Sequence, residues 1–238
     1  MLTVHLARPL LALLLASGIA GRAAQSQSSL RDVLRPDRLS AARDSFVVLM
    51  QGQPRGWQRL VRTARPDGWE FEDAVSITSL VTQSSRILMS PTLHERSLRQ
   101  SGDMSGKPMA ITLDFADGRV RGTANTPSSP SGPITIDTTA AAGVIDDNAL
   151  LSLLVAVPWR DSLVVTAPYL TSGKGTIEQA TMRAVSAETV SVPAGSFDVW
   201  RVELLMGRSK TLAFVTRQAP YRIVRIQLGP AFEMQLVR

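Results

Sequence analysis

The sequence has 238 residues, of which 44% are hydrophobic and 19% charged, and it contains no cysteine. This balance supports a folded core and argues against wholesale disorder. Without cysteine, the chain cannot form disulfides, thiolate metal sites, cysteine nucleophiles or the lipid anchor of bacterial lipoproteins. The net charge is +6, but the basic residues are interspersed and form no run of the kind that binds nucleic acid.

The first 23 residues are typical of a cleavable secretory signal peptide. Arg8 precedes an apolar run from Leu10 to Ala20, which is shorter than the roughly 20 residues that span a bilayer. Gly21 and Ala23 then suit the −3 and −1 positions of a cleavage site, although Ala24 and Ser26 form a second such pair. An uncleaved membrane anchor is the alternative. We expect a periplasmic or secreted protein with no stable membrane anchor after cleavage.

Residues 24–43 are polar and predict an N-terminal tail with a short helix, followed by a single β domain over residues 44–238. The first half of that domain alternates apolar and polar residues between turn signals such as Arg65-Pro66-Asp67-Gly68. Such short turns indicate antiparallel neighbours. The predicted strands here are Phe46–Met50, Trp57–Ala64, Trp69–Ile77, Ser79–Met89, Leu93–Gln100, Met109–Phe115 and Val120–Ala124.

The middle of the chain predicts one short helix over residues 147–155. Asp146 and Asp147 suit its N-terminus, and Pro158 follows its end. The segment is apolar nearly all round, so we expect it to be buried against a sheet. Further strands are predicted at Thr135–Thr138, Ser162–Ala167, Thr176–Ala187, Glu188–Val192, Phe197–Met206, Lys210–Thr216, Tyr221–Leu228 and Ala231–Val237.

The predicted fold class is therefore mainly β. We expect a single curved antiparallel sheet, or an open barrel, of about 10–12 strands with one inserted short helix.

Residues suited to catalysis are scarce. His94 is the single histidine after the predicted cleavage site, which predicts a surface residue rather than a catalytic base or a histidine-rich metal site. Asp146 and Asp147 allow a paired-carboxylate reading, but their place before the helix favours capping. Ser196 lacks the G-x-S-x-G pattern, and Gly173-Lys174-Gly175 lacks the spacing of a phosphate loop. We expect no enzyme activity, no metal and no cofactor.

Six aromatic residues on predicted strands are the candidate ligand-binding residues. If the sheet curls, their inward faces could line an apolar cavity for a lipid or another apolar ligand. The alternative is that they fill the core. The six are Trp69, Phe71, Phe115, Trp200, Phe214 and Tyr221.

The C-terminal third carries a motif. Residues 190–204 read VSVPAGSFDVWRVEL, and Phe214-Val215 and residues 219–225 (APYRIVR) follow. The stretch resembles a family of exported bacterial β-sheet proteins of unknown function with a V-P-A-G-[ST]-F motif. The upstream residues 114–120 and 143–146 also fit. That family is distantly similar to periplasmic lipoprotein carriers with curved antiparallel sheets. The resemblance implies a tight turn at Pro193-Ala194-Gly195 and a buried strand from Phe197, and it implies no catalytic residues.

Three functions remain open at this point. The first is a non-enzymatic binding protein for an apolar ligand or envelope component. The second is an assembly factor that contacts another envelope protein through an exposed strand edge. The third is a hydrolase that uses scattered Asp and Glu residues. A wide apolar cavity favours the first, a solid core with an exposed apolar patch the second, and two convergent carboxylates in a cleft the third.

Overall fold

A computed structural model describes residues 27–238 apart from 128, 130–131 and 141–142. The predicted signal peptide lies outside the described residues. Within them the chain forms one 16-stranded sheet, in which nearly all neighbours are antiparallel. The predicted class, a mainly β protein with a single curved sheet and an inserted short helix, is confirmed. The strand number is higher than the expected 10–12, because short strands form in segments with weak alternation.

The strand order is β1-β11-β12-β13-β14-β15-β16-β2-β3-β4-β5-β6-β7-β8-β9, with β10 also paired to β11. The strands are β1 (Gln27–Ser29), β2 (Ala42–Met50), β3 (Gln53–Arg65), β4 (Gly68–Ile77), β5 (Val81–Met89), β6 (Glu95–Met104), β7 (Lys107–Ala116), β8 (Arg119–Asn125), β9 (Ile134–Thr139), β10 (Ile145–Asp146), β11 (Val164–Thr171), β12 (Thr176–Val192), β13 (Gly195–Met206), β14 (Ser209–Thr216), β15 (Ile223–Leu228) and β16 (Phe232–Leu236).

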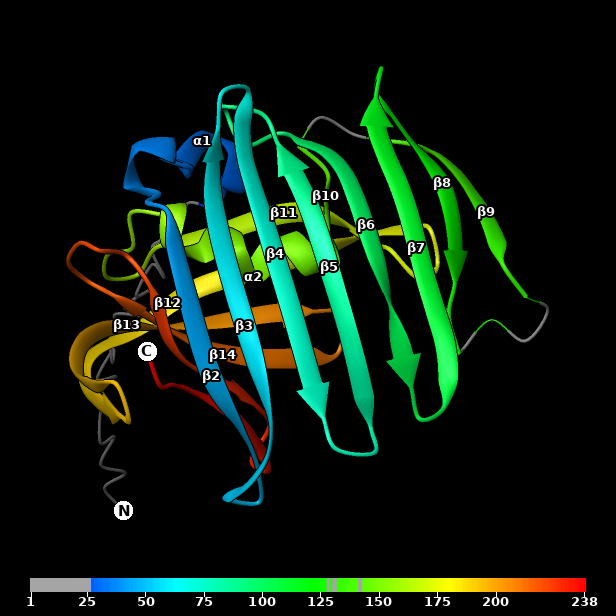
Figure 1. The fold of residues 1–238 in the computed structure, drawn as a ribbon. Coiled ribbons are helices and arrows are strands. Elements are labelled where there is room, and N and C mark those ends of the chain that lie inside the picture. The colour runs from blue at the N-terminus through cyan, green and yellow to red at the C-terminus, as the bar shows by residue number, and fades with distance from the viewer. Residues whose placement is uncertain (1–26, 128, 130–131, 141–142) are drawn as a thin grey trace, which may run out of the picture.

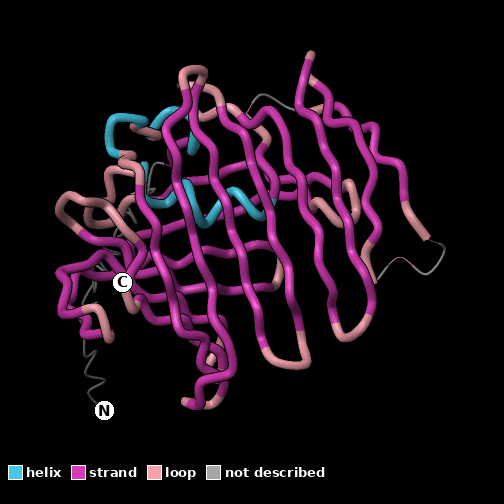
Figure 2. The backbone as a smooth tube through the Cα atoms, in the orientation of Figure 1, coloured by secondary structure: helices cyan, strands magenta, loops and turns pink. Residues whose placement is uncertain are grey.

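The sheet folds back on itself into two layers. Strands β2 to β9 run side by side across the front of Figure 1, and β11 to β14 cross behind them at a steep angle. Helix α2 (Asp147–Leu153) lies between the layers, as the tube in Figure 2 also shows. The layers therefore face each other across the helix, and the core fills the space around it.

Helix α2 and the 3-10 helix η2 (Leu154–Ala156) are the centre of that core. Leu150, Leu153, Leu154 and Val155 have no exposed surface. This is the burial that the all-round apolar sequence predicts. The predicted N-cap is also present, since the Asn148 backbone N–H donates to Asp146 Oδ1 over 2.6 Å.

Two predicted elements need correction. Residues 27–39 are not a free tail: β1 pairs in parallel with β11, and α1 (Leu30–Val33) and η1 (Pro36–Arg38) follow it. Leu30, Leu34 and Leu39 are buried, and these apolar side chains hold the segment on the domain. The strands predicted at Thr176–Ala187 and Glu188–Val192 form one strand, β12, which a bulge between Ala184 and Ser186 bends without interrupting it.

Strand β9, at one end of the sheet, meets the turn between β11 and β12 at a seam. Thr138 Oγ1 on β9 donates to the carbonyl oxygen of Gly175, in the turn between β11 and β12, over 3.1 Å. Gly175 has a φ of +72°, and a Cβ there would meet Ile136 Cγ1 at 3.0 Å. Glycine is therefore required both for the turn and for the close approach of β9 to it.

A buried pair of carboxyl groups joins β10 to β6. The Asp146 backbone N–H donates to Glu95 Oε2 over 2.8 Å, and both side chains are buried. Glu95 Oε1 and Asp146 Oδ2 have no hydrogen-bond partner when both groups are deprotonated. Burial, then the charge and side chain of Asp146, raise the pKa of Glu95 well above its usual range. A proton held by Glu95 and donated to Asp146 gives both oxygens a partner, which is consistent with the raised pKa of Glu95.

The first prediction concerns the helix. Replacing Leu150 by alanine removes a fully buried side chain from between the layers, and we expect a loss of about 2–5 kcal/mol in unfolding free energy. Leu151→Ala is the matched control, because Leu151 is only partly buried on the same helix. Urea unfolding followed by circular dichroism measures both variants. Equal losses would contradict the central position of α2.

The second prediction concerns the carboxyl pair. The folded state holds the Glu95 proton, while the unfolded chain releases it above about pH 4.3. The stability contributed by Glu95 is therefore complete at low pH and is lost as pH rises toward the raised pKa. Asp146, Asp147 and Arg31 are the charged groups that interact with Glu95.

We expect Glu95→Gln to keep the bond to the Asp146 N–H and to remove this part of the pH dependence. The stability of Glu95→Gln relative to wild type should therefore rise between pH 5 and pH 8, as measured by urea unfolding at each pH. Glu95→Ala should be less stable than Glu95→Gln by about 1–3 kcal/mol, because it leaves buried polar groups of Asp146 unpaired. A pH-independent difference between Glu95→Gln and wild type would show that Glu95 is not protonated in the fold.

Candidate functional site: the inner cleft

A cleft of about 570 Å³ opens between the two layers, next to α2. Its size falls within the range of small-molecule sites, roughly 300–1,000 Å³. We call it the inner cleft. Its lining residues come from β5, β6 and β7 on one side and from α2, the end of β11 and two loops on the other: Gln83, Gln100, Met104, Met109, Ile111, Thr126, Pro127, Asp147, Asn148, Thr171, Ser172, Gly173 and Lys174.

One wall of the inner cleft is apolar. Met109 and Ile111 alternate with exposed residues along β7, so both side chains face the inside of the sheet. Met104, at the end of β6, is 42% exposed and lies at the rim. Two flexible thioethers and a branched side chain give this wall a surface that can adapt to an apolar group.

The facing wall is polar and is built around Asp147. Ser172 Oγ donates to Asp147 Oδ1 over 2.6 Å, and Asn148 Nδ2 donates to the same oxygen over 3.2 Å. Burial, followed by the charge of Asp146, raises the pKa of Asp147 to about 6, against the opposing effect of the Ser172 hydrogen bonds. The capping interpretation is therefore right for Asp146, whereas Asp147 lines the cleft.

Polar side chains continue from the cleft across the inner face of the sheet. Gln100 faces Ser85 on β5, and Ser85 in turn faces Asp73 on β4. Gln58 Nε2 on β3 lies 2.9 Å from both oxygens of Asp73. We call Gln58, Asp73, Ser85 and Gln100 the inner polar row.

The inner polar row is unusual because it lies among core residues. Asp73 shares its face of β4 with the buried Phe71 and Val75, and this burial raises its pKa to about 6 while the Gln58 hydrogen bond lowers it. Gln58 and Gln100 are 5% and 7% exposed, and the Oε1 atom of each has no hydrogen-bond partner. Such groups cost stability unless a partner is supplied.

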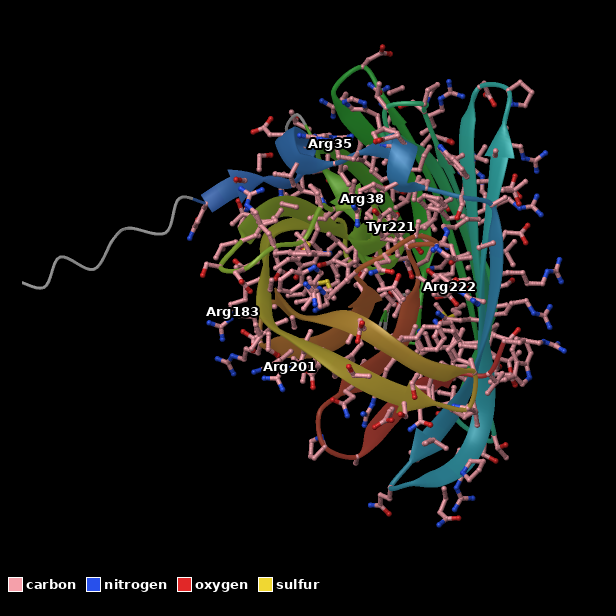
Figure 3. The ribbon with its side chains drawn as sticks, turned by 90° about the vertical axis from the view of Figure 1, so that its left-hand side faces the viewer. Arg35, Arg38, Arg183, Arg201, Tyr221 and Arg222 are labelled. Atoms are coloured by element: carbon pink, nitrogen blue, oxygen red, sulfur yellow. The ribbon has the colours of Figure 1, made fainter. Side chains whose placement is uncertain are left out.

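The six aromatic candidates pack with the core and do not gather around the inner cleft. Phe71 and Phe214 are buried, and Trp69, Phe115, Trp200 and Tyr221 are partly buried against the same core. Three of them make cation–π contacts with arginines. The guanidinium carbon lies 5.0 Å from the ring centre for Arg217 and Trp200, 5.4 Å for Arg225 and Phe214, and 3.4 Å for Arg38 and Tyr221. Figure 3 shows Tyr221 beside Arg38 at the end of the molecule that carries the N-terminal segment. Contact of any of the six with a ligand stays a prediction.

None of the residues that line the inner cleft is among the six predicted ligand-binding residues, because the sequence pattern that marks them is weak. Gln58, Asp73, Ser85 and Gln100 stand at inward positions of otherwise apolar strands, so a polar residue breaking the alternation was the available sign. On β4, Trp69, Phe71 and Asp73 share one face by strand alternation, and Asp73 is the polar residue among them. His94 is exposed, as expected, with Nδ1 2.9 Å from Thr92 Oγ1.

Two kinds of feature are absent from the described residues. No helix among them is long and apolar enough to cross a membrane. No three histidine or acidic side chains in the same residues are grouped so that they could hold a metal ion.

Comparison with known proteins places the chain by fold and family. The crystal structure of a β-barrel-like protein of the domain of unknown function DUF1849, from Brucella abortus, is similar with a TM-score of 0.54. The alignment covers 86% of this chain and 98% of that chain at 11% identity, so it supports the fold alone. A search of curated proteins gave no significant match. The family model for DUF3108, proteins of unknown function, matches residues 42–237, and the chain therefore belongs to the DUF3108 family.

Proposed function

We propose that this protein is a non-enzymatic binding protein, acting in the periplasm or after secretion, which holds a small amphiphilic ligand in the inner cleft. The observation that carries the proposal is the division of the cleft into two walls. Met104, Met109 and Ile111 offer apolar contact, and Asp147 and Asn148 offer polar groups on the opposite side. A mainly apolar pocket with a few fixed polar groups is the usual form of a small-molecule site.

The core limits what such a ligand can be. Helix α2 occupies the space between the layers, so the interior holds a solid centre and a cleft beside it rather than a wide lumen. A volume of about 570 Å³ suits a short acyl chain, one branch of a larger lipid or a compact amphiphile. A large lipid would extend past the rim at Met104.

A strand edge supports a second candidate function, in assembly with another envelope protein. In the described part of the chain the sheet ends at β9, which pairs with β8 on one side. An extended segment of a partner could add to the other side of β9 by strand addition. The inner cleft is the better supported site, because its wall includes the buried and unpaired Gln100 oxygen.

The test is a titration of the purified mature protein with octyl β-glucoside below its micelle concentration, followed by isothermal calorimetry. We expect saturable binding of one ligand per protein. Met104→Asp should weaken it about tenfold, since a charge replaces an apolar contact at the rim. Leu228→Asp is the matched control, because Leu228 is similarly exposed, at 44%, and lies outside the cleft.

Binding that is unaffected by Met104→Asp, or equally weakened by both variants, would place the ligand elsewhere. A protein that binds no octyl probe would contradict the proposal. A partner strand cross-linked to β9 in that protein would then support the assembly function.

A further inference from the structure

The inner cleft also carries information about the polar part of its ligand. This step rests on the proposed function, since it asks which head group the cleft would accept. The starting point is Gln100, which is 7% exposed, faces the inside of the sheet and lines the cleft. Its Oε1 atom is buried without a donor. A buried amide oxygen of this kind needs an N–H or O–H from outside the described residues.

The rest of the inner polar row adds acceptors. Gln58 directs its Nε2 group to the Asp73 carboxylate, which leaves Gln58 Oε1 as a second buried oxygen without a donor. Ser85 is the single hydroxyl donor in the row, and it stands between Asp73 and Gln100. In this row the buried side-chain atoms without a partner are therefore two amide oxygens, Gln58 Oε1 and Gln100 Oε1.

The charged residues around the cleft also disfavour a negatively charged head group. Among the described residues that line it, Asp147 is the one acid and Lys174 the one base. Asp147 is half-buried, and Lys174 is exposed on the turn between β11 and β12. Solvent screens the lysine more strongly than the aspartate, so the field inside the cleft is set by Asp147, with Asp73 behind it. A negatively charged head group would meet repulsion there.

We infer that the cleft selects amphiphiles whose head group donates hydrogen bonds and carries no negative charge, such as a sugar hydroxyl or a primary ammonium, with Gln100 as the specificity-determining acceptor. Fatty-acid carboxylates and other anionic heads are disfavoured. The head group donates one hydrogen bond to Gln100 Oε1, which otherwise has no partner, and a second one to the Asp147 carboxylate.

The experiment compares three probes with unbranched alkyl chains: octyl β-glucoside, octylammonium and octanoate, each titrated by calorimetry at pH 7.5 below the micelle concentration. We expect the glucoside and octylammonium to bind at least tenfold more tightly than octanoate. The alkyl chain of octanoate is one methylene shorter, which accounts for about a fourfold difference, so a ratio of tenfold or more reports on the head group. Octanoate binding as tightly as the glucoside would overturn the inference while leaving the proposed function intact. The absence of binding by all three would overturn both.

Two variants assign the selectivity to residues. Gln100→Leu removes the acceptor at similar size, and it should weaken glucoside binding about tenfold while leaving octanoate unchanged. Asp147→Asn removes the charge but keeps an oxygen for Ser172, and it should strengthen octanoate binding several-fold. Gln53→Leu, at the exposed start of β3, is the control for glutamine removal. A Gln100→Leu variant that folds and keeps full glucoside selectivity would contradict the role of Gln100. Should it fail to fold, unchanged octanoate binding in Asp147→Asn would overturn the charge argument.

Discussion

The structure depends on the burial of one short apolar helix between two parts of the same sheet. A 16-stranded open sheet has two large faces, and it becomes a stable domain only when one face is covered. Here the sheet covers itself, and α2 with η2 fills the space that its curvature leaves. Leu150, Leu153 and Leu154 belong to a single buried cluster that also contains residues of both layers, such as Phe71 on β4 and Val165 on β11.

The position of the cleft follows from that packing. Among the described residues the sheet does not close into a continuous ring of hydrogen bonds, and at the seam β9 meets the turn between β11 and β12 through Thr138 and Gly175. Next to the seam, β10 and the start of α2 occupy the gap, held to β6 by the bond from the Asp146 N–H to Glu95. The same geometry that buries Asp146 leaves the following residue, Asp147, at the cleft wall.

Buried polar groups concentrate on the sheet half that faces the cleft. Gln58 and Gln100 each hold a buried oxygen without a partner on the inner face of the sheet, among apolar core residues. Desolvation of such groups weakens the fold. A protein shaped by stability alone would place leucine or valine at these positions. Their presence on this face supports the proposal that the inner cleft binds a ligand.

The sequence by itself determined the β architecture, the turns and the buried helix, because alternation, turn residues and an apolar run with an acidic cap act over short distances. The candidate site, in contrast, is formed by contacts between strands that are far apart in the sequence. No local signal brings Glu95 to Asp146, 51 positions away, or sets Gln100 opposite Ser85 and beside Asp147. The aromatics were the visible candidates, since they bury the most surface, and for that reason they pack with the core. Only the tertiary structure decided which inward polar residues meet, because the register of neighbouring strands and the closure of the sheet around α2 fix that meeting.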